Sequence, residues 1–279
     1  MVILFFVLCS GYSVFAYHII GGEMIYTRLT GNNFEIKLKL YRDCSAAEAA
    51  PFDNPLQIYV YNAAGALVDS LVVFFPGSEN LDPDLTNPCI TYIPDLCIQE
   101  AIYIGNINLP PSVGGYDLVY QRCCRNTTII NIVDPVATGA TYTEHIPDPG
   151  TVINSSARFS NFPPIVICAN FPFNFDHSAT DPDGDVLVYE WFHPLNGATY
   201  DVPDPSPAPG PPFEEVNFYG PYSYTYPIES DPAFSINSTT GFLSGTPTSL
   251  GQFVVGIACL LYTSPSPRDR TRSRMPSSA

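Results

Sequence analysis

The chain has 279 residues and is strongly acidic, with 27 Asp and Glu residues against 11 Lys and Arg residues and a net charge of −16. A charge of this sign repels nucleic acids and anionic membranes, and the few basic residues are too scattered to form a binding patch. Nucleic acid is therefore not an expected partner. The 29 prolines and 19 glycines fall mostly between apolar runs, as turn residues do.

Residues 1–16 are predicted to be a secretory signal peptide. Their apolar run ends in Val14 and Ala16, which match the small-x-small pattern of a cleavage site. The run is shorter than the roughly 20 apolar residues that span a bilayer, and no later stretch is apolar enough to do so. We therefore expect export, no transmembrane span, and an oxidising environment in which disulfide bonds persist.

The chain after residue 16 shows the two-residue alternation of β-strands. From Phe34 to Leu40 every even-numbered residue is apolar and every odd-numbered residue is charged, which predicts a half-buried strand. Similar runs occupy residues 56–61, 66–75, 101–107 and 116–123, and Asn62 to Gly65 forms a hairpin-type turn between two of them. Only residues 46–50 have a helical composition.

This pattern predicts an all-β chain of two β-sandwich domains, residues 17–163 and 164–258, the second of them immunoglobulin-like or cadherin-like. In the second domain we expect a strand at residues 186–189 and a short strand between two turns at residues 240–247. Trp191 is expected to anchor the core between two sheets. The proline-rich residues 203–212 are expected to form an extended surface loop.

Six cysteines are disulfide candidates once Cys9 of the signal and Cys259 of the C-terminal tail are set aside. They are Cys44, Cys89, Cys97, Cys123, Cys124 and Cys168, and six cysteines allow 15 pairings. Cys89 and Cys97 are the best local pair. Neighbouring residues of a strand point to opposite faces, so Cys123 and Cys124 are each expected to find a distant partner.

The segment Asp181-Pro-Asp-Gly-Asp185 is the one candidate metal site. Its three carboxylates, Asp181, Asp183 and Asp185, stand at alternate positions and could converge on Ca²⁺, which takes six to eight oxygen ligands. The alternative is a tight turn without a metal, in which Gly184 takes a positive φ and the Asp side chains accept hydrogen bonds from their own backbone. Both interpretations stay open at this point.

Residues 259–279 match the translation of a transposase-type sequencing adapter, and we expect the natural chain to be cut off after about Ala258. Without this tail, residues 1–258 hold seven basic and 26 acidic residues, a net charge of 7 − 26 = −19. Cys259 would then be foreign and should not be paired with Cys168. Such segments are set aside when a fold is derived from a sequence.

No catalytic motif is present, so an enzyme is not expected. The string Ile19-Ile-Gly-Gly22 resembles the mature start of chymotrypsin-like proteases, but the sequence contexts of the catalytic His and Ser of that family do not occur. His177 and Ser178 are adjacent, and adjacent strand residues face apart, so they do not form a nucleophile–base pair easily.

Several longer strings resemble one family over nearly the whole chain. They are residues 18–24 (HIIGGEM), 38–44 (LKLYRDC), 114–126 (GGYDLVYQRCCRN), 161–164 (NFPP) and 175–185 (FDHSATDPDGD). Together they look like the N-terminal region of Bacteroidota surface proteins that end in a gliding-motility-associated, type IX secretion sorting domain. The resemblance implies a large secreted or outer-membrane-attached protein of repeated β-sandwiches, with the sorting domain beyond residue 258.

These observations lead to two functional hypotheses. The first is a non-enzymatic cell-surface or secreted protein with a structural or adhesive role, possible calcium binding, and other surface proteins or glycans as partners. The second is a carbohydrate-binding or accessory region of a larger secreted polysaccharide-active enzyme, favoured by the 18 Tyr and 18 Phe residues.

Overall fold

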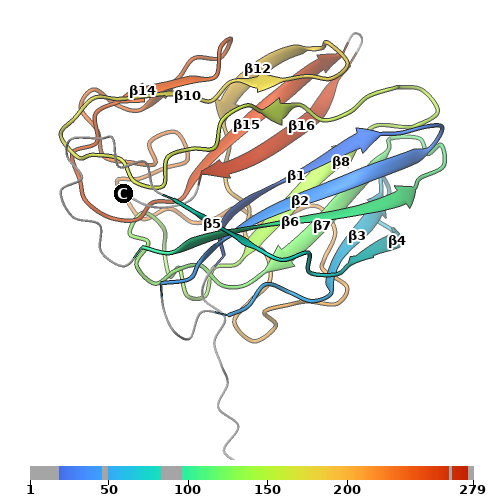
Figure 1. Ribbon diagram of the computed structural model, residues 1–279, viewed down its shortest axis with the longest axis horizontal. Helices are drawn as coiled ribbons and strands as arrows, with labels where there is room; N and C mark the ends of the chain where they lie inside the picture. The colour runs from blue at the N-terminus through green and yellow to red at the C-terminus, as the bar shows by residue number, and fades with distance from the viewer. Residues whose placement is uncertain (1–18, 46–49, 83–95, 264–265, 276–279) are drawn as a thin grey trace, which may run out of the picture.

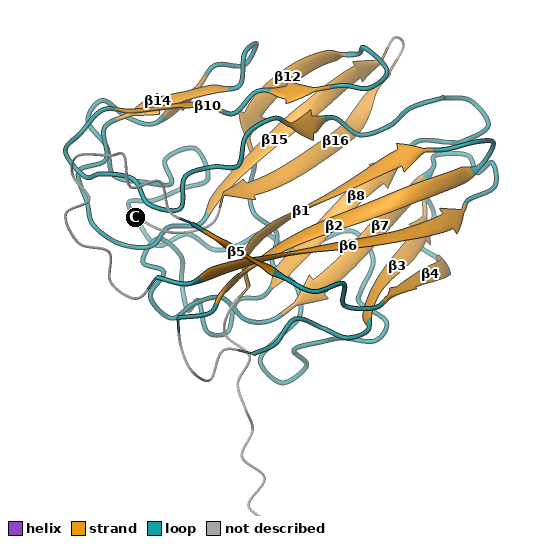
Figure 2. Ribbon diagram, in the orientation of Figure 1, coloured by secondary structure: helices purple, strands orange, loops and turns teal. Residues whose placement is uncertain are grey.

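The computed structural model describes residues 19–45, 50–82, 96–263 and 266–275, and these residues form strands and loops without any helix (Figure 2). The expected all-β fold is confirmed. The largest sheet has seven strands in the order β12-β15-β16-β1-β2-β6-β5. In that order they span Val186–Trp191, Val255–Thr263, Ser266–Met275, Ile19–Arg28, Asn33–Asp43, Ile98–Asn108 and Glu79–Leu81.

A four-stranded antiparallel sheet, in the order β4-β3-β7-β8, packs behind strands β1, β2 and β6 (Figure 1). Its strands span Leu67–Val73, Leu56–Asn62, Tyr116–Arg122 and Ala140–Ile146. Two small sheets complete the fold. One has the order β10 (Phe173–Asp176), β14 (Phe242–Gly245) and β13 (Ser235–Ile236), and the other pairs β11 (Ala179–Thr180) with β9 (Arg158–Phe159).

The main core lies between the two large sheets and follows the alternation of β2. Phe34, Ile36, Leu38 and Leu40 are at most 1% exposed, whereas the odd-numbered residues of the strand face outward. They pack with inward residues of β3 and β7 in one cluster. Full burial of an aliphatic side chain contributes about 2 kcal/mol, so this alternation accounts for much of the stability of the sandwich.

Two long strands, β1 and β8, were not predicted. β1 is buried over residues 20–26 without alternation, because one face meets the core while the other lies under a later part of the chain. A side chain at Gly22 would stand 2.5 Å from the Lys39 carbonyl oxygen. The Ile-Ile-Gly-Gly string therefore has a packing role in a close strand pair.

The predicted turns and strands of the second half are largely confirmed. β12 includes residues 186–189, and β14 follows a turn at residues 238–240 in which Gly241 has φ of 73°. The second expected turn is not seen among the described residues, because Gly245 belongs to β14. Trp191 ends β12, where it is half-buried against the core cluster that contains Phe234 and Ile257. The helical composition at residues 46–50 falls mostly on 46–49, which lie outside the described residues.

The proline-rich segment 203–212 is irregular, as expected, but it is anchored to β3. Ala208 is buried, and its carbonyl oxygen accepts a hydrogen bond from the Tyr61 hydroxyl. The hydroxyl groups of Tyr59 and Ser206 lie 2.9 Å apart. The segment therefore covers part of the outer face of the four-stranded sheet.

The order of the seven-stranded sheet bears on the predicted domain boundary and on the tail. β12 and β15 reach the first sandwich through β16, which pairs with β1 at Glu23 and Met24. Residues of the 259–279 segment thus take part in this sheet. The division at residues 163 and 164, and the adapter origin of the tail, stay predictions.

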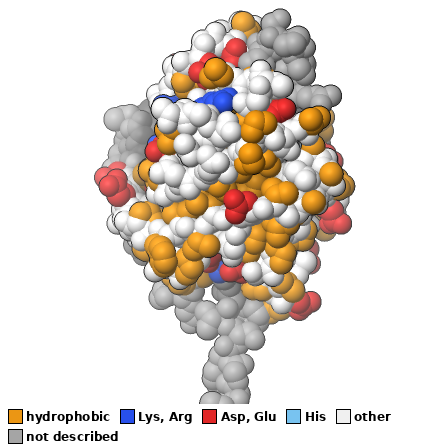
Figure 3. Space-filling model, turned by 90° about the vertical axis from the view of Figure 1, so that its right-hand side faces the viewer, with side chains coloured by type: hydrophobic (Ala, Val, Ile, Leu, Met, Phe, Trp, Pro, Cys, Tyr) orange, Lys and Arg blue, Asp and Glu red, His pale blue; other side chains and the backbone are white. Residues whose placement is uncertain are grey.

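β4 forms one edge of the four-stranded sheet and has an apolar outer surface. Leu67, Val68 and Val72 of β4, and Phe74 directly after it, are 45–71% exposed. Figure 3 shows this side of the molecule, where hydrophobic side chains spread across the face and charged groups are sparse. An exposed apolar edge strand can pair with another chain.

Candidate functional site

The Asp181–Asp185 segment forms the tight turn that its sequence predicts. The Asp181 carboxylate accepts hydrogen bonds from the backbone N–H groups of Asp183 and Asp185, both at 2.9 Å. Gly184 has φ of 85°, a conformation that glycine adopts without a steric penalty. The turn connects β11 to β12.

This turn is tied to the first sandwich. The Asp183 carboxylate accepts a hydrogen bond of 2.6 Å from the Ser155 N–H, and the Ser155 and Ser156 hydroxyls accept bonds from backbone N–H groups of β1. Within the described ranges, no group of three or more His, Cys, Asp and Glu side chains gathers closely enough to hold a metal ion. The structure therefore contains the predicted turn, whereas calcium binding at this turn stays a prediction.

The disulfide pairs differ from those expected. Cys97 is bonded to Cys44, not to Cys89, and this bond joins the end of β2 to the start of β6. Cys123 and Cys124 are bonded to each other across a cis peptide bond, so the expectation of distant partners was wrong. The chain leaves β7 at Arg122, and the rule that neighbouring side chains face apart does not apply beyond the strand.

The remaining cysteines fit the expectations more closely. Cys168 is disulfide-bonded. Cys259 is buried and free, so it is not paired with Cys168. Burial raises the pKa of the Cys259 thiol to about 12, which keeps it protonated and unreactive at neutral pH. Cys89 lies outside the described residues.

A cavity of about 260 Å³ that the sequence did not predict opens on the outer face of the seven-stranded sheet. Its floor is set by strand register: Glu23 of β1 lies opposite Lys39 of β2, and Glu100 of β6 lies opposite Tyr41 of β2. The Lys39 ammonium group contacts the Glu23 carboxylate at 2.5 Å. We name this space, lined also by Asp82, the acidic cavity.

Tyr41 is held firmly in the acidic cavity. Its hydroxyl is hydrogen-bonded to Glu100, and its ring lies 4.8 Å from the Phe162 ring, centroid to centroid. Burial, and then the charges of Glu23 and Glu100, raise the pKa of the Tyr41 phenol far above its ordinary value. The phenol is therefore a neutral hydrogen-bonding group and not a base.

The opposite wall comes from the chain after β9 and from His177. His177 is fully buried and stacks on Phe159, with ring centroids 4.1 Å apart. Burial lowers the pKa of its imidazole to about 4, against a weaker opposing effect of a hydrogen bond with the Asn161 backbone. At neutral pH the wall is therefore uncharged, and the charges of the acidic cavity lie on its floor and rim.

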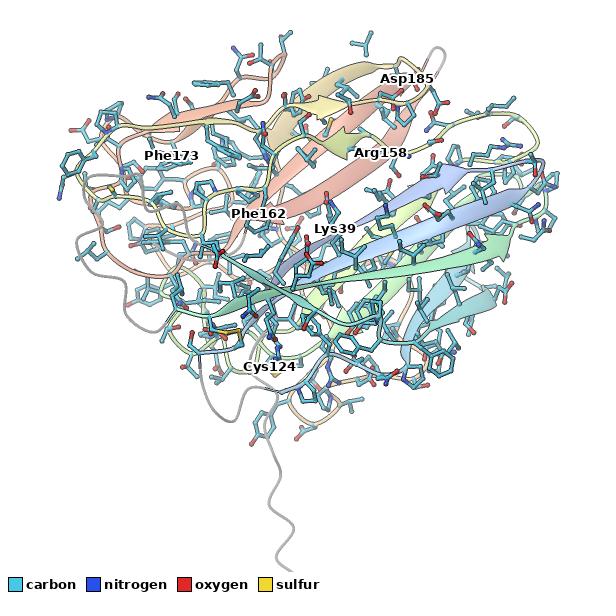
Figure 4. All side chains as sticks on the ribbon, in the orientation of Figure 1. Lys39, Cys124, Arg158, Phe162, Phe173 and Asp185 are labelled. Atoms are coloured by element: carbon cyan, nitrogen blue, oxygen red, sulfur yellow. A yellow bond between two sulfur atoms is a disulfide. The ribbon has the colours of Figure 1, made fainter. Side chains whose placement is uncertain are left out.

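Four of the strings that carry the family resemblance contribute to this cavity. They supply Glu23 from 18–24, Lys39 and Tyr41 from 38–44, Phe162 from 161–164, and His177 from 175–185. Figure 4 shows Lys39 and Phe162 close together where the two parts of the chain meet. A sequence signal was therefore present, although spacing alone could not bring these strings together.

Comparison with protein-family models, with curated proteins and with solved structures found no match to this chain. Over the part of the chain that the structure describes, no helix has the length and apolar character needed to cross a membrane.

Proposed function

We propose that this chain is a non-enzymatic binding module of a secreted or surface-attached bacterial protein, with a structural or adhesive role. The observation that carries the proposal is the acidic cavity, whose floor residues all stand on strands: Glu23 on β1, Lys39 and Tyr41 on β2, and Glu100 on β6. Sites built on strands hold their side chains more rigidly than sites on loops. The Cys44–Cys97 bond, next to the cavity strands β2 and β6, supports an oxidising location.

Adhesion can be tested with microspheres coated with the full chain. We expect the coated spheres to attach to one another or to surfaces carrying extracellular proteins or glycans, above the level of albumin-coated spheres. Coating with chain that has been reduced and alkylated in denaturant should abolish attachment, because the fold is lost. Attachment equal to that of albumin on every surface would count against the proposal.

Calcium forms a separate part of the proposal. One oxygen of Asp181 and one of Asp185 are inaccessible to solvent and have no hydrogen-bond partner. Burial, and then the charges of Asp181 and Asp183, raise the pKa of the Asp185 carboxyl. A cation at the turn would satisfy these oxygens and relieve the repulsion between the carboxylates.

We therefore predict that millimolar calcium raises the melting temperature relative to a chelator. Asp185→Asn should remove this difference, because it takes away one of the two carboxylates at the turn while the hydrogen bonds to Asp181 remain. Glu214→Gln, at an exposed carboxylate in the 203–216 region, is the matched control and should keep the difference. Equal melting temperatures in calcium and chelator would exclude calcium from the proposal.

Carbohydrate binding is the second candidate function, and the aromatic side chains at the acidic cavity favour it. Tyr41, Phe159 and Phe162 lie beside carboxylates and the Asn161 amide, a combination that can stack on a sugar ring and bond its hydroxyls. A glycan array with the full chain tests this candidate. Glycan binding that is lost in Phe162→Ala would support carbohydrate binding, and no binding to any glycan on the array would contradict it.

A further inference from the structure

The acidic cavity continues into a second hollow of about 390 Å³, and the two share Asp82, Phe162 and Pro163. Most of the residues that line the second hollow are apolar. It is lined by residues 163–167, a Pro-Pro-Ile-Val-Ile run, and by Phe173 and Phe175 of β10. We name this space the apolar hollow. In Figure 4, Lys39, Phe162 and Phe173 mark the course of this groove from one hollow to the other.

The acidic cavity has more negative than positive charge. Glu23, Glu100 and Asp82 face a single cation, Lys39, which already contacts Glu23. The rings of Tyr41 and Phe162 stand beside these carboxylates. Carboxylates next to aromatic rings favour an ammonium or guanidinium group, and the net charge of −16 attracts a basic partner from a distance.

The apolar hollow lies against a sheet edge that no other described strand pairs with, although the Asp176 carbonyl oxygen accepts a hydrogen bond from the Asn161 side-chain amide. β10 is the outer strand of the β10-β14-β13 sheet and pairs with β14 on one side, from Phe173 to Asp176. Every second backbone N–H and C=O group of an edge strand points away from its neighbour. Such an edge accepts an extended peptide as an additional strand.

We propose that this groove binds an extended peptide segment of a partner protein that carries a basic side chain next to apolar ones. The Arg or Lys side chain enters the acidic cavity beside Tyr41 and Glu100. An apolar side chain enters the apolar hollow against Ile165 and Phe173, and the peptide backbone pairs with β10. This inference rests on the proposed function as a binding module and identifies the chemistry of its partner.

The probe is a fluorescein-labelled peptide, acetyl-Thr-Ile-Thr-Arg-Thr-Ile-Thr-amide. Side chains alternate along an extended chain, so its Arg and both Ile side chains lie on one face. The sequence is symmetric, and it presents the same pattern in either strand direction. The control peptides carry citrulline in place of Arg, which removes only the charge, or Ser in place of both Ile residues.

We expect saturable binding of the probe to the full chain by fluorescence anisotropy, with about tenfold weaker binding of the citrulline peptide. Glu100→Gln and Phe162→Ala should each weaken probe binding by a similar factor. Glu214→Gln, which makes the same charge change at an exposed site outside the groove, should leave binding unchanged. Raising the salt concentration from 50 to 500 mM should weaken binding of the Arg peptide more than that of the citrulline peptide.

Equal affinity for the Arg and citrulline peptides, or no saturable binding at millimolar probe, would overturn the proposal. Self-association by analytical ultracentrifugation that Phe162→Ala abolishes, with no probe binding, would assign the groove to a second copy of the chain. The sphere assay separates the two levels of inference. Adhesion of the wild-type chain without saturable probe binding refutes this inference alone, whereas absence of adhesion by the wild-type chain refutes the proposed function.

Discussion

His177 should make the stability of this protein fall as the solution becomes acidic. The imidazole is fully buried, stacked at 4.1 Å on Phe159 and 5.6 Å from the Phe175 ring centroid, and its pKa is lowered from 6.5 to about 4 by burial. The unfolded chain, with a pKa near 6.5, binds a proton that the folded chain does not bind until about pH 4. The stability that neutral His177 contributes is therefore full above pH 6.5 and is lost progressively down to about pH 4.

The size of the effect follows from the difference in pKa. At about 1.4 kcal/mol per pKa unit, the shift from 6.5 to about 4 amounts to about 3 kcal/mol. Urea unfolding at pH 7.5, 6.5, 5.5 and 4.5 measures this loss, and His177→Phe provides the comparison because it keeps an aromatic ring in the stack. Carboxylates titrate in the same range in both proteins, so the relevant quantity is the difference between the two curves.

We expect the wild-type protein to lose about 2.5 kcal/mol more than His177→Phe between pH 7.5 and 4.5, since the rest of the shift is lost only below pH 4.5. A second variant, His177→Gln, has a polar side chain that does not titrate and should resemble His177→Phe in pH dependence, whatever its absolute stability. Parallel curves for all three proteins would show that His177 is accessible to protons in the folded state and would refute the reasoning.

Three further predictions concern other parts of the molecule. Replacing Cys44 and Cys97 by Ala removes a cross-link with a sequence separation of 53 and should lower the free energy of unfolding by about 4 kcal/mol through chain entropy. Urea unfolding midpoints with and without reductant measure this loss, and the wild-type midpoint must fall when reductant is added. Arg125→Met removes the hydrogen bonds that the buried guanidinium donates to the Gly139 and Leu195 carbonyl oxygens and should cost about 2 kcal/mol, whereas Arg158→Met, at an exposed position, should cost well under 1 kcal/mol. Val72→Lys on the apolar edge strand β4 should reduce self-association, measured as the rise of light scattering with protein concentration. Unchanged scattering would exclude this edge as a contact between copies of the chain.

Strands with one face in the core and one in solvent could be predicted from the sequence, and β2 is the clearest case. Its alternation survives in the structure residue by residue from Phe34 to Leu40. β1 and β8 could not be found in this way because both of their faces are covered. In β8 the buried set includes Thr141, Thr143 and Glu144, so neither hydrophobicity nor alternation marks the strand.

The Asp181 turn was predictable because its geometry is local. An Asp side chain that accepts hydrogen bonds two and four residues along the chain, and a glycine at positive φ, depend only on neighbouring residues. The Cys44–Cys97 disulfide and the groove depend on residues far apart in the sequence. The Cys44–Cys97 pair exists because β2 and β6 lie side by side over their full length, which no spacing rule contains.

The same register that closes the core also builds the acidic cavity. Because the even-numbered residues of β2 face inward, Lys39 and Tyr41 face outward, and the neighbouring strands place Glu23 and Glu100 opposite them. A slip of one residue between β2 and β6 would move Glu100 away from Tyr41 and would also turn the core residues outward. The floor of the cavity is therefore as firmly fixed as the core beneath it, so a ligand meets charges that need little reorganisation, as a binding surface requires.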